Sequence, residues 1–428
     1  MASLFTSHSL PNYGGWQEQH NAAVAHAVGI DHPGEFIPYK GRSLQRKFVG
    51  FHSIWKYAMK IAINATCLNS QPTGTTQRFK GIYRELFTRL QDTEFVVFEP
   101  LDCRISSWFD RFDNVSFRRT PLSSQDRVER FIRGVLFWPR ILKNERFDIL
   151  EVSNLPLAGS LRGRTILTLH DIRYVSQNSG VVSKSINKFI LDKSVAQCER
   201  IITISESVRS EILSFYPDRS VSVVHNGIDI SFFQAMSSSD LQSVRDCYNL
   251  PNDFVLSVGH FEDRKNYINL VTAVARLRDQ GRAVFLVIVG NDNGQLAAVK
   301  KHIHSLGIAT NVTILNGLSD FELSCIYRLC RLFVFPSYYE GFGIPILEAM
   351  AADCPVVLSD IPVFKEITQS QGVYFEHSDP ESIATVIDEV LASDSERCRL
   401  MQYGRERVQD FSFRKVSMDL EGVYRSLS

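Results

Sequence analysis

The stretch 333–360 reads F-V-F-P-S-Y-Y-E-G-F-G-I-P-I-L-E-A-M-A-A-D-C-P-V-V-L-S-D. Residues 332–335 form a short apolar run, which is typical of a strand buried on both faces. A loop with two glycines follows, and then Pro345, whose fixed φ suits the first turn of a helix. Residues 346–352 favour a helix, and residues 355–358 predict a second buried strand. The pattern therefore predicts a strand–loop–helix–strand unit of an α/β protein.

The loop of this unit has the composition of an anion-binding site. Gly341 and Gly343 let the backbone approach a ligand closely, and the N–H groups at a helix start bind phosphate. Two carboxylates, Glu340 and Glu348, bracket the site. A ligand with hydroxyl groups on both sides of its phosphates, such as a nucleotide sugar, explains them. The alternative is that Glu348 only complements the helix dipole and the glycines only turn the chain.

The whole string resembles the signature of the retaining glycosyltransferases of family 4, which have the GT-B fold. The resemblance covers about residues 60–428. It implies two Rossmann-like parallel-sheet domains that face each other across a cleft, with a C-terminal helix that crosses back to the N-terminal domain. It also implies that Glu340 is catalytic and that six residues of the stretch bind the donor: Gly341, Phe342, Gly343, Ile344, Leu347 and Glu348.

The composition limits the class of protein. A length of 428 residues predicts two or three domains, and a formal net charge of zero gives no reason to expect nucleic acid as a partner. No apolar run is long enough for a transmembrane helix, and the N-terminus lacks the pattern of a signal peptide. The eight scattered cysteines fit buried thiols of a reducing cytosol better than disulfides or zinc. We therefore expect a cytoplasmic protein, with peripheral contact at the inner face of the membrane as an addition.

Strand and helix patterns alternate along most of the chain, as expected for parallel sheets covered by helices. The predicted organisation has five parts. They are a poorly assigned N-terminal extension (1–59), a Rossmann-like acceptor domain (60–235), a linker (236–253), a Rossmann-like nucleotide-sugar donor domain (254–410) and the crossover helix (411–428).

Two positions of the first domain are candidates for the cleft. Gly74 lies in a loop between a predicted strand and a helix, but the strict G-x-G-x-x-G fingerprint is absent. His170 and Asp171 follow the apolar strand 165–169, at the edge where α/β sheets bind ligands. The resemblance implies that Gly74 approaches the donor phosphates and that His170 faces the donor sugar. The alternatives are a plain turn and a structural histidine.

The second domain begins with the strand 254–258, which is followed by Gly259 and by the cations Arg264 and Lys265. Adjacent cations are often a solvated surface pair. The resemblance instead implies that Arg264 and Lys265 are catalytic residues that clamp the donor diphosphate, and that Gly259 binds the donor. It also places Gly317 beside the nucleobase.

Two interpretations stay open for each of two basic segments: a membrane contact or an ordinary part of the domain surface. Residues 40–60 are basic and irregular, and a loosely ordered extension is the favoured interpretation. Residues 127–146 are basic on one side and apolar on the other. They predict either a helix that contacts anionic lipid or, as the favoured interpretation, an ordinary domain helix with solvated arginines.

The reaction implied by the resemblance is transfer of a hexosyl unit from a nucleotide-diphosphate sugar with retained anomeric configuration. The expected acceptor is a saccharide or a lipid-linked saccharide in cell-surface polysaccharide synthesis, and mannose is weakly favoured. No D-x-D motif is present, so neither a metal nor another cofactor is expected. The alternatives are a glycoside hydrolase, a nucleotide-sugar epimerase and a non-catalytic nucleotide-sugar-binding protein.

Overall fold

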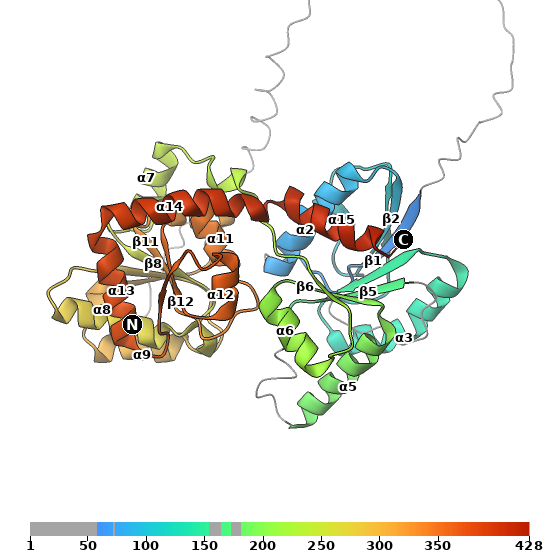
Figure 1. The fold of residues 1–428 in the computed structure, drawn as a ribbon, viewed down its shortest axis with the longest axis horizontal. Coiled ribbons are helices and arrows are strands. Elements are labelled where there is room, and N and C mark those ends of the chain that lie inside the picture. The colour runs from blue at the N-terminus through green and yellow to red at the C-terminus, as the bar shows by residue number, and fades with distance from the viewer. Residues whose placement is uncertain (1–57, 72, 154–163, 173–180, 428) are drawn as a thin grey trace, which may run out of the picture. The chain divides into compact units, whose positions relative to one another are not determined.

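The computed structural model describes residues 58–71, 73–153, 164–172 and 181–427 (Figure 1). The predicted extension and its basic segment lie outside these ranges, apart from residues 58–60. The described residues form two parallel β-sheets, of seven and six strands, with helices between the strands. In this part of the chain, no helix is both long and apolar enough to cross a membrane.

The first sheet has the strand order β3-β2-β1-β4-β5-β6-β7. Its strands are β1 (Met59–Asn64), β2 (Thr93–Glu99), β3 (Val115–Arg119), β4 (Ile149–Ser153), β5 (Arg164–Leu169), β6 (Arg200–Thr203) and β7 (Val221–Val223). The helices of this half are α2 (Gly74–Arg89), α3 (Arg127–Asn144), α5 (Val181–Gln197) and α6 (Glu206–Phe215). Strand β3 was not predicted, because an edge strand that is only half-buried lacks the continuous apolar run of its neighbours.

The second sheet has the order β10-β9-β8-β11-β12-β13. Its strands are β8 (Val255–Val258), β9 (Leu286–Val289), β10 (Val312–Leu315), β11 (Leu332–Phe335), β12 (Val356–Ser359) and β13 (Val373–Phe375). The helices around it are α7 (Ser238–Cys247), α8 (Tyr267–Asp279), α9 (Leu296–Ser305), α10 (Asp320–Leu329), α11 (Ile344–Ala351), α12 (Pro362–Ile367), α13 (Pro380–Ala392) and α14 (Asp394–Val408). Helix α7, from the predicted linker, packs Val244 into the core of this half.

The last helix, α15 (Phe413–Arg425), belongs to the first sheet although it follows α14 of the second (Figure 1). Its apolar stripe of Val416, Leu420 and Tyr424 is buried in the cluster that covers β1 and α2. At its surface, Arg89 of α2 forms an ion pair of 2.6 Å with Glu421. The predicted fold class is therefore confirmed, including the helix that crosses back.

The strand order reverses between β1 and β4 in the first sheet and between β8 and β11 in the second. In open α/β sheets, the loops that leave the carboxyl ends of the strands at such a reversal form the ligand crevice. The loops that follow β1, β8 and β11 are the ones that carry Gly74, the Arg264–Lys265 pair and Glu340. The topology thus brings residues that are far apart in the sequence to comparable places on the two sheets.

Candidate active site

Two loops at the carboxyl edge of the second sheet form the centre of the candidate site. Strands β8 and β11 are parallel neighbours, so the loops that follow them leave the sheet side by side. The first loop carries Arg264 and Lys265 in a short 3-10 turn, and the second carries Glu340. The predicted diphosphate clamp and the first predicted glutamate therefore meet.

Glu340 joins the two loops through one carboxylate oxygen. Its Oε1 lies 2.5 Å from Arg264 Nη1 and 2.8 Å from Lys265 Nζ. The same oxygen accepts a hydrogen bond of 2.9 Å from Ser337 Oγ. Arg264 also pairs with Glu262. The side chains of Glu340 and Lys265 are 10% and 7% exposed, so their ion pair is largely shielded from water.

The charges in this cluster keep Glu340 ionised. Burial alone would raise the pKa of Glu340, but Lys265 and Arg264 outweigh burial and hold the pKa below its ordinary value. Burial lowers the pKa of Lys265, although Glu340 opposes that shift. The Lys265 ammonium also lies 4.5 Å from the centre of the Phe335 ring, which is a cation–π distance.

Glycines shape the backbone around this cluster. Gly259 ends β8 with a φ of 153°, and a Cβ at this position would lie 2.7 Å from Lys265 Cε. Gly343, the N-cap of α11, has a φ of 123°, and its Cβ would lie 3.1 Å from Ile346 Cδ1. Other residues are strained at both positions. Gly317 turns the chain ahead of α10 with a φ of 68°.

Glu348, the second predicted glutamate, has a different environment. Its Oε2 accepts a hydrogen bond of 2.8 Å from Tyr327 Oη of α10. Burial and, to a smaller extent, Asp320 raise the pKa of Glu348 to about 7, although Tyr327 and Lys265 oppose the shift. Glu340 and Glu348 thus lie on one loop and helix but differ in charge state near neutral pH, because only Glu340 contacts cations.

The apolar donor-binding candidates contribute to the core through their side chains. Phe342 is 3% exposed and packs against His225 and Phe411, and Leu347 is completely buried. Neither side chain is available to a ligand at the surface of the loop. Any donor contact from these two residues must come from the backbone.

The predicted phosphate-binding amides at the start of α11 are fewer than the sequence suggests. Pro345 has no N–H, and the N–H of Ile346 donates to the Gly343 carbonyl at 2.9 Å. The N–H groups of Gly343 and Ile344 make no intrahelical hydrogen bond, because they precede the first full turn of α11. They are the two that remain for an anion.

Loops of the first sheet lie against the Glu340 loop. A Cβ on Gly341 would be 3.0 Å from the His170 carbonyl oxygen, and a Cβ on Gly74 would be 2.7 Å from Ile344 Cδ1. Ser205 Oγ, at the N-cap of α6, donates a hydrogen bond of 2.7 Å to the Gly341 carbonyl. The structure therefore brings Gly74 and His170 to the same site as Glu340.

His170 is a neutral side chain at physiological pH. Burial and, to a smaller extent, Arg78 lower its pKa to about 4, although Asp171 opposes the shift. The ring borders a small cavity of about 20 Å³, room for roughly one water, together with Arg78, Thr75 and Ser153. A neutral imidazole there can donate or accept a hydrogen bond but brings no charge to a sugar.

Sequence reasoning missed several residues that hold the site. Tyr327 lies inside a helix without a motif, and Ser337 lies in a loop of small polar residues. Glu366 of α12 accepts hydrogen bonds from the N–H groups of Glu206 and Ser207 and lies 2.9 Å from His225 Nε2. The Pro336–Ser337 turn was a weak signal for Ser337. No local sequence pattern marks Tyr327 or Glu366.

Two family models match successive parts of the chain. The model described as Glycosyltransferase Family 4 matches residues 85–232, and the model described as Glycosyl transferases group 1 matches residues 248–407. The first match covers most of the first sheet, and the second includes β8, β11 and the glutamates of the candidate site.

Curated relatives of the chain include bacterial mannosyltransferases. The O-antigen chain mannosyltransferase RfbU of Salmonella typhimurium is 29% identical over 54% of this chain. The serotype-specific mannosyltransferase WbdA of Escherichia coli is 28% identical over 63% of it. The matched regions span 61% of RfbU and 34% of WbdA, so the chain is compared with only part of each relative.

Solved structures match the chain over most of its length. A glycosyltransferase of Rickettsia africae covers 86% of this chain and 98% of its own, with a TM-score of 0.67 and 16% identity. Anabaena HepE, solved in complex with UDP-glucose, covers 86% of this chain and 100% of its own, with a TM-score of 0.65 and 18% identity. These structures share the GT-B fold with the chain.

Proposed function

We propose that this chain is a retaining glycosyltransferase. It moves a hexosyl unit from a nucleotide-diphosphate sugar to a saccharide or lipid-linked saccharide acceptor during cell-surface polysaccharide synthesis. The observation that carries the proposal is the shielded cluster of Glu340, Arg264 and Lys265 at the strand reversal of the second sheet, against the loops of His170 and Gly74. The similarity to the mannosyltransferases RfbU and WbdA supports mannose as the transferred sugar.

The cluster suits the loss of a diphosphate leaving group. Arg264 and Lys265 offer several N–H donors and two positive charges to the oxygens that become more negative as the bond to the sugar breaks. Glu340 remains ionised and can accept hydrogen bonds from sugar hydroxyls while it stabilises positive charge near the anomeric carbon. Because two side-chain cations take the place of a metal in this scheme, we propose that the reaction needs neither a metal nor another cofactor.

The proposed reaction exchanges one bond at the anomeric carbon for another. The bond between that carbon and the diphosphate oxygen breaks, and the acceptor oxygen bonds to the same face. The acceptor proton passes to the departing phosphate oxygen, so the chain need not supply a side-chain base. Neutral His170 would contribute a hydrogen bond to a sugar hydroxyl.

A thermal-shift panel of nucleotide sugars, followed by product analysis, tests this function. A donor at about 100 times its dissociation constant adds roughly 2.7 kcal/mol of stability, which ranks GDP-mannose against UDP sugars. UDP sugars belong in the panel because HepE was solved with UDP-glucose. Transfer with retained configuration in the presence of a chelator supports the proposal. A failure of every nucleotide sugar to stabilise the protein, or hydrolysis or epimerisation without transfer, contradicts it.

We also propose that helix α3 contacts anionic lipid and so brings the protein to a membrane-borne acceptor. Ile132 and Leu136 are 60% and 78% exposed on a face that also presents Arg140 and Lys143. Exposed apolar residues beside basic ones fit the interface of an anionic bilayer. Arg130 is excluded from this face, because its guanidinium donates to the carbonyls of Ser123 and Ser124.

Flotation with vesicles tests the lipid contact. We expect the wild type to float with phosphatidylglycerol-rich vesicles and not with phosphatidylcholine vesicles. The double variants Ile132→Ser/Leu136→Ser and Arg140→Glu/Lys143→Glu should lose at least about tenfold in binding, since each charge contributes about 1 kcal/mol near such a surface. The control is Lys300→Glu/Lys301→Glu, an equal charge change on the exposed face of α9. Unchanged binding in both α3 variants would remove the proposal.

A further inference from the structure

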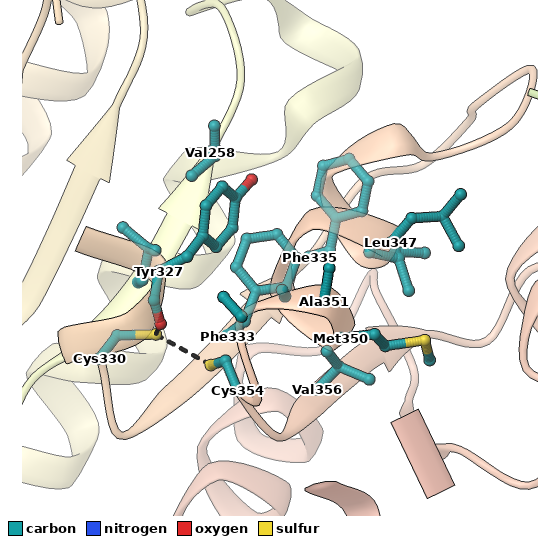
Figure 2. Close-up of a cluster of buried hydrophobic side chains, with 14 of the residues drawn as sticks. Val258, Tyr327, Cys330, Phe333, Phe335, Leu347, Met350, Ala351, Cys354 and Val356 are labelled. Atoms are coloured by element: carbon teal, nitrogen blue, oxygen red, sulfur yellow. Dashed lines mark hydrogen bonds between the residues drawn. The ribbon is translucent and has the colours of Figure 1, made fainter. Parts of the chain in front are cut away.

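Tyr327 is a buried polar side chain that the proposed reaction leaves unused. Its side chain is completely buried in α10. Figure 2 shows the ring among apolar residues of the second half, close to Phe333 of β11. The ring centroids of Tyr327 and Phe333 are 5.5 Å apart, and those of Tyr327 and Phe233 are 6.3 Å apart. The ring is therefore held firmly by its neighbours.

The fixed ring places its hydroxyl group against Glu348. Burial raises the pKa of Tyr327 well above its ordinary value, and Glu348 raises it further, so the phenol remains a hydrogen-bond donor at any physiological pH. It donates to Glu348 Oε2 at 2.8 Å. In the described part of the chain, Oε1 of Glu348 accepts no hydrogen bond from another residue. One oxygen is thus occupied by Tyr327, and the other has no hydrogen-bond partner among the described residues.

We propose that Tyr327 is a positioning residue that orients Glu348 to accept hydrogen bonds from the ribose hydroxyls of the nucleotide donor. The inference rests on the proposed function, because it needs a nucleoside diphosphate in this site. Tyr327 fixes the direction of the carboxylate and favours its ionised form. A protonated Glu348 would offer one hydroxyl group of its own and a weaker acceptor, so it would bind the ribose less well.

The groups that act on Glu348 come from two elements, α10 and the loop after β8. Tyr327 approaches from the body of α10, Asp320 acts from the start of the same helix, and Lys265 acts from the loop after β8. Asp320 disfavours the ionised form, whereas Tyr327 and Lys265 favour it. Since Lys265 is already engaged with Glu340, the tyrosine hydroxyl is the direct contact that counters burial.

The test measures nucleotide affinity against pH in the whole protein. Calorimetric titrations of the best nucleoside diphosphate and of its 2′,3′-dideoxy analogue are run from pH 5.5 to 8.5. Wild-type affinity for the ribonucleotide should fall as pH drops through about 7, approaching tenfold per pH unit, while the dideoxy analogue shows little of this change. In Tyr327→Phe, the midpoint should move to higher pH, with binding at pH 7 about tenfold weaker.

Two variants calibrate the result. Glu348→Gln should remove the pH dependence near neutrality. Tyr216→Phe is the matched control, because it also removes a hydroxyl that donates to a carboxylate, here Asp192 at 2.6 Å in the first half of the chain. The control should retain the wild-type midpoint. A fluorinated tyrosine at position 327, as a stronger donor, should move the midpoint to lower pH and serves if Tyr327→Phe does not fold.

The outcomes separate this inference from the proposed function. If the wild type binds no nucleoside diphosphate or nucleotide sugar, the proposed function itself is overturned. If the wild type binds but Tyr327→Phe keeps the wild-type midpoint, or loses the same factor for both nucleotides at every pH, the positioning role is overturned. A shifted midpoint that affects only the ribonucleotide supports it.

Discussion

At the scale of single residues, the carboxyl groups of Glu340 and Glu348 ionise differently, although the two residues are neighbours on the same loop and helix. Glu340 is ionised because Arg264 and Lys265 lie within hydrogen-bond distance of the same oxygen. Glu348 titrates near pH 7 because burial dominates and its direct partner is a neutral phenol. Two carboxylates with separated pKa values can serve separate roles, one toward developing charge and the other toward hydroxyl groups.

Substitution of Glu340 should separate catalysis from stability. Glu340→Gln retains the shape of the side chain but leaves two shielded cations without their carboxylate, so we expect transfer to fall at least about 100-fold and stability at neutral pH to fall by about 3 kcal/mol. Lys265→Ala should also abolish transfer. Initial rates with the best donor, together with urea unfolding, measure the two effects. A variant with wild-type activity at either position would overturn the assignment of the site.

The pH dependence of stability tests the charge state of Glu340. Its pKa is lower in the folded protein than in the unfolded chain, so its contribution is complete above the unfolded value of about 4.5 and is lost as pH falls through the folded value. The stability difference between wild type and Glu340→Gln should therefore be constant near neutrality and shrink below about pH 4.5. Glu381→Gln, at an exposed ion pair with Arg276, is the control. A difference that does not change with acid would contradict the ion pairing.

At the scale of secondary-structure elements, α15 is the least local part of the fold. The helix follows the second sheet, yet it buries Val416, Leu420 and Tyr424 against the first. Tyr424 also donates a hydrogen bond to Glu151 of β4, a buried carboxylate that Thr168 contacts at 3.1 Å. The apolar stripe supplies most of the attachment, and the tyrosine hydroxyl satisfies a charge that burial would otherwise penalise.

Loss of that hydroxyl should destabilise the protein without changing its fold. Tyr424→Phe removes one donor from buried Glu151, which should cost about 1–3 kcal/mol in the free energy of unfolding. Urea denaturation followed by circular dichroism measures the loss. Met418→Ala on the exposed side of the same helix should leave stability nearly unchanged, since Met418 is 53% exposed. Equal effects of the two substitutions would show that the Glu151 contact is not stabilising.

At the scale of the whole molecule, both sheets must contribute for the site to be complete. Ser205 bonds to Gly341, and Glu366 bonds to the start of α6 and to His225, so polar contacts link the first-sheet loops to the second sheet. The Glu366 carboxylate lies at the N-terminus of α6, where an anion is favoured by the helix dipole as well as by direct hydrogen bonds. This residue is therefore a strong candidate for holding the two halves together around a donor.

Removal of the Glu366 carboxylate should weaken donor binding indirectly, through the contact between the two halves. We expect Glu366→Ala to raise the KM for the nucleotide sugar about three- to tenfold, because fewer molecules have both halves in contact, and to increase the radius of gyration in X-ray scattering. Glu381→Ala, which removes an exposed carboxylate inside the second half, should change neither quantity. Unaltered KM and scattering in Glu366→Ala would show that this contact does not set the arrangement of the two halves.

Much of the fold was predictable because its signals are local. Apolar runs such as 332–335 and 356–358 predicted buried parallel strands, and the apolar stripe of 411–427 predicted the crossover helix. Strand β3 was not predicted, because Val115, Phe117 and their polar neighbours are only half-buried at the edge of the sheet. The glycines and glutamates of the candidate site were found because they are close together in the sequence and match a family pattern.

The amino-acid sequence alone determined the two-sheet class, the family resemblance and the candidate residues of the Glu340 loop. Local periodicity and short motifs suffice for these three predictions, since each signal spans about twenty residues of sequence. Only the tertiary structure decided the charge states of Glu340 and Glu348. Their partners lie 75 and 21 residues away in the chain, at Lys265 and Tyr327, and come close only when the strands and helices pack. Burial and contact set a pKa, and neither is present until the chain has folded.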